Sequence, residues 1–253
     1  MLKLVKRITY FSVIGIAVIS CKDDHTEPEP IDPKSELKVT VQPVFGGVEL
    51  DLDSTYTTAA GHDIQFVNLK FFMEDIRTPS GSLHTAALFD YRETGISLFQ
   101  TEGETAEATS LTANLGVGAT NNHSDPTAFP TASALNILNS GGMHWSWNPG
   151  YIFVKVEARV DTIPDGIPLF DHNVIFHIGK DVNLQNLSFS SLNWQKETDV
   201  INTLPLKLDM VKFLDNGIQS IDLLTEYTSH SSSGQEVLSL KVIENFRDAL
   251  STY

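Results

Sequence analysis

Residues 152–161 read IFVKVEARVD, and apolar residues occupy every second position from Ile152 to Val160. Polar residues from Lys155 to Asp161 fill the positions between them. An alternation of period two indicates a β-strand with one buried face and one solvated face. Residues 37–42 repeat this pattern. Further segments typical of strands are separated by clusters of Gly, Asn, Asp and Pro, and they cover residues 64–76, 85–90, 95–99, 173–178, 183–189 and 203–210.

No helix of crossover length is expected between these strands, which favours antiparallel pairing over a parallel α/β sheet. We therefore predict a mainly β protein, in which residues 37–253 form one antiparallel, sandwich-like domain. Two helices are expected within it, a short one over residues 133–139 and a C-terminal one over residues 236–250. The C-terminal helix is indicated by a Ser-x-x-Glu capping box and an apolar stripe at i+3 spacing. These features are formed by Ser233, Glu236, Val237, Leu240, Ile243 and Phe246.

The charge balance bears on the class of partner. The chain has 253 residues, with 17 Lys and Arg against 32 Asp and Glu, a formal charge of −15. Such a surface repels a phosphate polymer, so nucleic acid is not an expected partner. The single cysteine excludes a disulfide framework and a cysteine-based zinc or iron–sulfur site. A metal ion would have to be bound by His, Met or carboxylate side chains.

The N-terminus has the pattern of a bacterial lipoprotein. Basic residues precede an apolar run over residues 8–19, which suits a secretory signal but falls short of the ~20 residues that cross a bilayer. The run ends at Cys21, as in a lipobox, although a buried free thiol is the alternative. We predict a signal peptide over residues 1–20 and a lipidated Cys21 that anchors the chain to the membrane, followed by an acidic, Pro-rich tether to residue 36. The sequence Lys22-Asp23-Asp24 resembles an export tag, which predicts an outer-membrane lipoprotein at the cell surface.

Several histidines have neighbours that draw attention. His123 lies in a polar loop, His144 follows Met143 and precedes Trp145, and His177 interrupts an apolar strand. His230 follows Thr228-Ser229 just before the last expected helix. A buried imidazole needs a partner for its nitrogens, because an unpaired buried polar group costs roughly 1 to 3 kcal/mol. A metal ion or a carbonyl group would satisfy this need equally well.

No hydrolase, zinc-protease or nucleotide-binding motif is present, so we do not expect an enzyme. The most distinctive segment is MHWSWNPGYIFVKVE over residues 143–157, which contains Trp145 and Trp147. In purely structural terms, residues 148–150 would be a turn that leads into a strand, and the tryptophans would cover a sheet edge.

The chain resembles the MbnP-like copper-binding family, named after a protein encoded with the copper-chelating peptide methanobactin. The W-x-W-x-x-G-Y block within residues 143–157 is the most specific point of resemblance. The matching segments are FVNLKFFMEDI at residues 66–76, LGV at 115–117 followed by Asn122-His123, ALN at 134–136, residues 143–157, and FHIG at 176–179.

The resemblance implies a β-rich protein that is secreted or associated with the outer membrane, and that binds copper through histidines. It also implies that a tryptophan beside the metal is oxidised to kynurenine by a dihaem partner enzyme. By position, His123 and His177 match family histidines, and Trp145 or Trp147 would be the modified residue. Glu74 stands where copper-binding members have a histidine.

We therefore expect copper uptake, storage or handling, with His123, His177, His144 and Met143 as candidate metal ligands. Trp145 and Trp147 would be the cofactor-forming residues, and an outer-membrane transporter is a second candidate partner. The alternative is a glycan-binding or adhesion module that uses Trp145, Trp147 and Tyr151 as a stacking platform. Exposed aromatic rings would favour the glycan module, and buried rings near the histidines would favour the metal.

Overall fold

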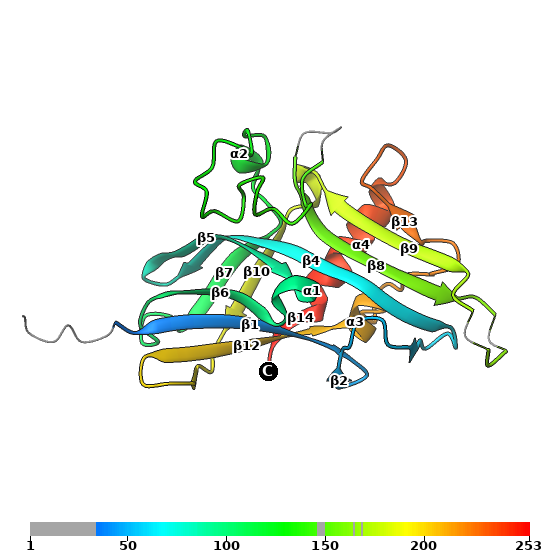
Figure 1. Cartoon of the computed structure of the whole chain (residues 1–253), viewed down its shortest axis with the longest axis horizontal. Coiled ribbons are helices and arrows are strands. Elements are labelled where there is room, and N and C mark those ends of the chain that lie inside the picture. The colour runs from blue at the N-terminus through cyan, green and yellow to red at the C-terminus, as the bar shows by residue number, and fades with distance from the viewer. Residues whose placement is uncertain (1–33, 146–149, 164, 168) are drawn as a thin grey trace, which may run out of the picture. The chain divides into compact units, whose positions relative to one another are not determined.

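The computed structural model describes residues 34–145, 150–163, 165–167 and 169–253, and these residues form two β-sheets with a C-terminal helix (Figure 1). The prediction of a mainly β, sandwich-like fold is confirmed. All described residues belong to one compact unit. No helix in this part of the chain is both long enough and apolar enough to cross a membrane. The predicted signal peptide, Cys21 and most of the predicted tether lie outside the described residues.

The smaller sheet is built around strand β1 (Glu36–Phe45), which lies parallel to β12 (Ile201–Asp209). The other strands of this sheet pair antiparallel with one of these two. They are β2 (Val48–Glu49), β6 (Ser97–Glu102), β11 (Gln195–Lys196) and β14 (Leu250–Thr252). The backbone amide of Glu36 donates to the carbonyl of Val200 at 2.7 Å. The folded unit therefore begins slightly before residue 37.

The larger sheet is built around the long strand β4 (Asp63–Thr78). Residues 152–161 form β8 in this sheet, as the alternation predicts, and β9 (His172–Gly179) pairs with it antiparallel. The remaining pairs are antiparallel except for β13 (Thr228–Ser229), which runs parallel to β9. The other strands are β3 (Tyr56–Thr57), β5 (Gly81–Asp90), β7 (Ser110–Leu115), β8 (Ile152–Asp161), β9 (His172–Gly179), β10 (Gln185–Ser190) and β13 (Thr228–Ser229).

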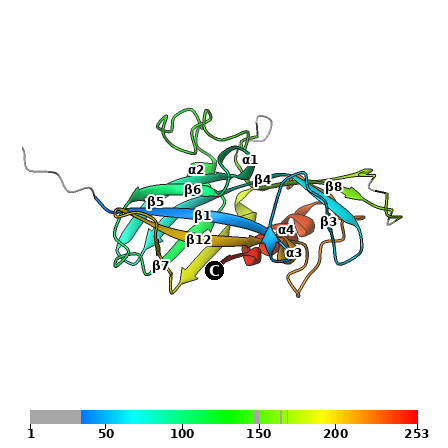
Figure 2. The same ribbon diagram turned by 60° about the horizontal axis from the view of Figure 1, so that its bottom comes forward.

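Helix α4 (Glu236–Ala249) contacts β9 and β10 of the larger sheet and β12 and β14 of the smaller one. Figure 2 shows α4 and α3 (Met210–Leu214) on one side of the larger sheet, below β8. The ring of Phe246 lies 5.5 Å from that of Phe71 and 5.8 Å from that of Phe213. The helix thus fills the core between the sheets. The short helices are α1 (Tyr91–Thr94), α2 (Ala119–Asn122), η1 (Asp181–Asn183) and α3 (Met210–Leu214).

Two expectations about strands and helices are wrong. The pairing is not wholly antiparallel, because β1 with β12 and β13 with β9 are parallel pairs. Residues 133–139 form turns rather than a helix. The buried side chain of Asn136 donates to the carbonyl of Phe129 at 2.7 Å and accepts from the amide of Leu138 at 3.0 Å. Such side-chain bonds to the backbone compete with helical bonds.

The C-terminal helix is confirmed, but its predicted start and face are corrected. Gln235 is the N-cap residue, and no side chain caps the helix, so the predicted capping box does not form. Val237 is 82% exposed, although it was expected in the apolar stripe. The buried face instead comprises Ser239, Val242, Ile243, Asn245, Phe246 and Ala249.

Candidate functional site

The segment with the tryptophans is tied to the start of β8. The amide of Trp145 donates to the carbonyl of Gly150 at 3.1 Å, and the amide of Ile152 donates to that of Met143 at 2.8 Å. These bonds flank residues 146–149, which lie outside the described residues and include Trp147. Met143 and Tyr151 are fully buried, and Trp145 is 6% exposed. The described part of the signature is therefore a core element.

The indole of Trp145 lies directly against the backbone of Gly179, at the end of β9. A Cβ atom at position 179 would stand 2.7 Å from the ring of Trp145 and 2.4 Å from the carbonyl oxygen of Tyr151. Only a glycine leaves room for this approach. Gly179, the last residue of the FHIG segment, therefore packs together with the segment that contains Trp145.

This burial counts against the glycan-binding alternative. A stacking platform needs an exposed aromatic face, and neither Trp145 nor Tyr151 offers one. The hydroxyl of Tyr151 instead donates to the carbonyl of Leu135, and its ring packs against the edge of His144 with a centroid distance of 4.9 Å. Burial raises the pKa of Tyr151 to about 12, with a smaller contribution from Asp125, and burial lowers the pKa of His144. The platform made of Trp145, Trp147 and Tyr151 is therefore wrong for the two residues that are described.

His123 follows helix α2 and forms an exposed pair with Asp181. Its Nε2 lies 2.8 Å from Oδ2 of Asp181, and the side-chain amide of Asn122 donates to Oδ1 of Asp181 at 2.7 Å. Burial opposes ionisation of Asp181, but these two contacts outweigh it and keep the pKa of Asp181 below its ordinary value. Oδ1 of Asn122 also accepts from the amide of Tyr151 at 2.7 Å. One asparagine therefore joins α2, η1 and the tryptophan segment.

Glu74 holds α2 in place from the neighbouring strand β4. Its side chain is buried and accepts from the amide of Gly118 at 2.8 Å, from Nδ2 of Asn121 at 2.5 Å and from Nδ2 of Asn114 at 3.2 Å. All three donors lie on or beside the segment that leads into α2. Glu74 is thus a structural hydrogen-bond acceptor. The sequence signal for this role is a carboxylate within the apolar run Phe-Phe-Met-Glu.

His177 lies on β9 and faces the carboxylate of Glu157 on β8. Its Nε2 lies 2.8 Å from Oε1 of Glu157, which also forms an ion pair with Lys155 at 3.2 Å. Asn68 donates to the other carboxylate oxygen at 3.1 Å. The hydrogen bond from His177, aided by Lys155, lowers the pKa of Glu157 to about 2 despite partial burial. The polar partner that we expected for His177 from its place in an apolar strand is therefore a carboxylate, that of Glu157.

His230 is the second imidazole at this place. The ring centroids of His177 and His230 are 4.9 Å apart, and the rings stand at 80° to one another. Burial lowers the pKa of His230, and the proximity of His177 lowers it further. The parallel pairing of β13 with β9 brings His230 here, because Ser229 aligns with Phe176. His230 was not among the predicted ligands, since this pairing leaves no mark on the sequence.

The structure separates the four predicted metal ligands into different environments. His123 pairs with Asp181, His144 with Tyr151 and His177 with Glu157 and His230, while Met143 lies in the hydrophobic core. Among the described residues, no three or more His, Cys, Asp and Glu side chains form a group that could hold a metal ion. A shared centre of three histidines and a methionine is therefore not seen here.

The two sheets and the C-terminal helix define a β-rich, sandwich-like protein. The family model described as MbnP matches residues 34–232, and the chain belongs to this family. The solved structure of MbnP from Methylosinus trichosporium is similar to 75% of this chain and 79% of that chain, with a TM-score of 0.48 and 16% identity. No curated protein matches the sequence.

Proposed function

We propose that this protein handles copper in the cell envelope and that the pair His177 and His230 is its copper site. Membership of the MbnP family supports a copper-associated function related to methanobactin. The observation that carries the proposal is the contact between the two imidazoles, with ring centroids 4.9 Å apart. The contact joins one family-matched histidine to a second potential ligand.

The chemistry of the pair fits copper. Imidazole is a ligand that copper accepts readily, and ligation requires its neutral form. The lowered pKa of His230 favours that form at neutral pH. Because Nε2 of His177 contacts Glu157, Nδ1 is the nitrogen that remains for a metal. A carboxylate that accepts from a ligating imidazole fixes the ring orientation and raises its basicity.

The surrounding residues position the pair rather than bind the metal. Glu157 orients His177, and Lys155 and Asn68 hold Glu157 on its other sides. Gln235 fixes His230 by accepting from its backbone amide at 2.9 Å. Copper bound here would be stored or passed on, and the chain's own residues would supply only ligation and orientation.

The cellular setting is part of the proposal. Lipidation at Cys21 would place the protein in the outer membrane, and the acidic tether would extend it from the surface. A dihaem enzyme that oxidises Trp145 or Trp147 to kynurenine, or an outer-membrane transporter, would be the partner. Mass spectrometry of the peptide that contains both tryptophans tests the oxidation. Replacing Cys21 with Ser should release the protein from membranes, and retention with unchanged lipid labelling would contradict the lipoprotein assignment.

Copper titration followed by elemental analysis tests the copper site. The wild-type protein should bind about one copper, as a single pair of imidazoles allows. His177→Ala and His230→Ala should each lose most of this binding. His84→Ala is the matched control, because His84 stacks on Phe99 with ring centroids 4.8 Å apart and contacts neither histidine of the pair.

The variant His123→Ala separates the two candidate sites. If copper is held by His177 and His230, this variant should bind copper as tightly as the wild type. If His123→Ala abolishes binding while His177→Ala and His230→Ala retain it, the copper site lies near α2 and the proposed pair is wrong. Absence of copper binding by the wild-type protein would contradict the proposed function itself.

A further inference from the structure

A cavity of about 410 Å³ lies between the β3–β4 hairpin and the segment that follows β12. Its volume is in the range of small-molecule sites, and its lining is mostly apolar. It shares no residue with the proposed copper site. Phe45, Leu214, Ile221 and Leu223 form the apolar wall, while His62, Asp215 and Asp222 supply the polar groups.

His62 lines this cavity and has an unpaired polar atom. Its Nδ1 is buried and has no hydrogen-bond partner among the described residues. A buried polar atom without a partner costs free energy and calls for an explanation. The backbone of His62 is fixed, since its carbonyl accepts from the amide of Thr58 at 2.8 Å across the hairpin. The imidazole is thus held in place in the wall of the cavity.

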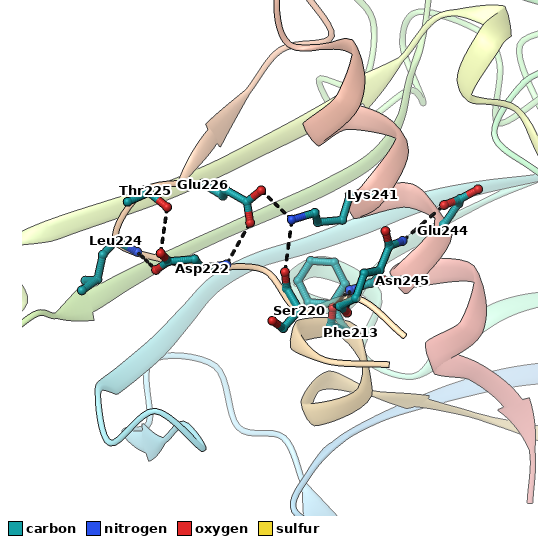
Figure 3. A network of polar contacts seen from close by, with 10 residues as sticks. Phe213, Ser220, Asp222, Leu224, Thr225, Glu226, Lys241, Glu244 and Asn245 are labelled. Atoms are coloured by element: carbon teal, nitrogen blue, oxygen red, sulfur yellow. Dashed lines mark hydrogen bonds and ion pairs between the residues drawn. The ribbon is translucent and has the colours of Figure 1, made fainter. Parts of the chain in front are cut away.

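The opposite wall is pre-formed by a polar network that joins it to α4 (Figure 3). Nζ of Lys241 donates to the carbonyl of Ser220 at 3.2 Å and to Glu226 at 2.5 Å. Nδ2 of Asn245 donates to the carbonyl of Phe213 at 3.0 Å and to that of Gln219 at 3.2 Å. A cavity whose wall is already fixed costs little conformational entropy when a ligand binds.

The electrostatics of the lining select the charge of the ligand. Both charged residues of the lining are carboxylates, Asp215 and Asp222, and no Lys or Arg is among the lining residues. Hydrogen bonds from Thr225 and Leu224 lower the pKa of Asp222, so this carboxylate is ionised at neutral pH. Phe45, which is 9% exposed, is the phenyl-bearing residue of the lining. These features favour a cation with a flat apolar body over an anion.

We propose that this cavity binds a small aromatic amine, whose ring packs against Phe45 and whose ammonium group is attracted by Asp215 and Asp222. The ligand is defined by this chemistry, and its binding does not depend on copper.

Calorimetric titration of the wild-type protein with tryptamine tests the proposal. Indole-3-acetate has the same ring and the opposite charge, so it serves as the matched ligand. Tryptamine should bind at least about tenfold more tightly than indole-3-acetate, a factor that corresponds to about 1.4 kcal/mol. Asp215→Asn and Asp222→Asn should each reduce the preference for tryptamine over indole-3-acetate. Asp222 accepts a hydrogen bond from Thr225 within a turn, and Asp215→Asn leaves that turn undisturbed.

Two further variants locate the binding. Ala60→Trp should fill the cavity and abolish tryptamine binding. His84→Phe, which changes a histidine outside the cavity lining, should leave it unchanged. If Ala60→Trp folds and still binds tryptamine normally, the ligand lies elsewhere and the proposal is overturned. Failure of the wild type to bind tryptamine, or equal binding of indole-3-acetate, overturns it as well.

Discussion

The carboxylate of Glu74, within strand β4, accepts a hydrogen bond of 2.8 Å from the backbone amide of Gly118, the N-cap residue of α2. The same carboxylate accepts from Asn114 and Asn121, so it satisfies three donors at once. Through α2 this contact also positions Asn122, which binds the amide of Tyr151. A buried strand residue thus determines where the loop above the sheet lies.

Replacement of Glu74 with Gln should destabilise the protein by about 2 to 3 kcal/mol, because an amide group would face donors that now meet a carboxylate. Urea denaturation measures this loss, and hydrogen exchange should show faster exchange at residues 118–122. Asp75→Asn is the matched control, since Asp75 is exposed and forms its ion pair with Arg77 on the surface. An equal effect of both substitutions would contradict the role of Glu74.

Gly179→Ala should separate the tryptophan segment from β9. The new methyl group would meet the ring of Trp145 and the carbonyl of Tyr151, and overpacking of this kind costs about 1 to 3 kcal/mol. The indole resonance of Trp145 in NMR spectra should shift. Gly217→Ala is the control, because nothing lies within 4 Å of a Cβ atom there, although its φ of +83° adds backbone strain. An unchanged Trp145 resonance in Gly179→Ala would contradict the contact.

Tyr151 should make stability depend on alkaline pH. Burial raises its pKa from 10.0 to about 12, so the folded protein keeps the phenolic proton when the unfolded chain loses it. The contribution of the protonated Tyr151 to the free energy of unfolding is fully present below pH 10 and is lost as the pH rises through 12. Tyr151→Phe should remove this dependence and cost about 1 to 2 kcal/mol at neutral pH, since the carbonyl of Leu135 loses its donor. Denaturation midpoints between pH 8 and pH 12 measure both effects, with the more exposed Tyr227→Phe as the control.

The strands could be predicted because a period of two is a local property of the sequence. Residues 152–161 and residues 173–178 fall within β8 and β9. Strand β7 was missed, although Leu111 and Leu115 are buried on one face, because Ala113 between them is a weak apolar signal. The parallel pairing of β1 with β12 joins residues 36–44 to residues 201–209, and no local pattern encodes a contact between segments so far apart in the sequence.

The sequence predicted one residue of the proposed site, His177, but not its contacts or the second imidazole, His230. The sequence singled out His177 as an imidazole that needs a partner, and the partner is Glu157 on the adjacent strand. The register of β8 and β9 selects this carboxylate, because Lys155 aligns with His177 and Glu157 lies diagonally to it. The register of two strands depends on the packing of the whole sheet, so it cannot be recognised from the local sequence pattern of either strand.

Lys70 and Asp90 form a buried ion pair. Its removal should lower the free energy of unfolding far more than removal of a surface pair. Their side-chain atoms lie 2.6 Å apart, with 12% and 6% of the side chains exposed, and Lys70 also donates to the carbonyl of Gly141 at 3.1 Å. Lys70→Met leaves the carboxylate of Asp90 buried without its counter-ion, which should cost about 3 to 5 kcal/mol. Guanidinium denaturation measures the loss.

The pair of Lys34 and Glu102 provides the comparison, because it has the same 2.6 Å separation but side chains that are 72% and 63% exposed. Lys34→Met should cost at most about 1 kcal/mol, since water screens the charges. In the double variant Lys70→Met, Asp90→Asn, part of the stability lost in Lys70→Met should return, because no charge is then left unpaired. If Lys70→Met and Lys34→Met lower the free energy of unfolding equally, burial does not control the strength of the ion pair between Lys70 and Asp90. If the double variant is no more stable than Lys70→Met, the loss comes from the bond to Gly141 rather than from an unpaired charge.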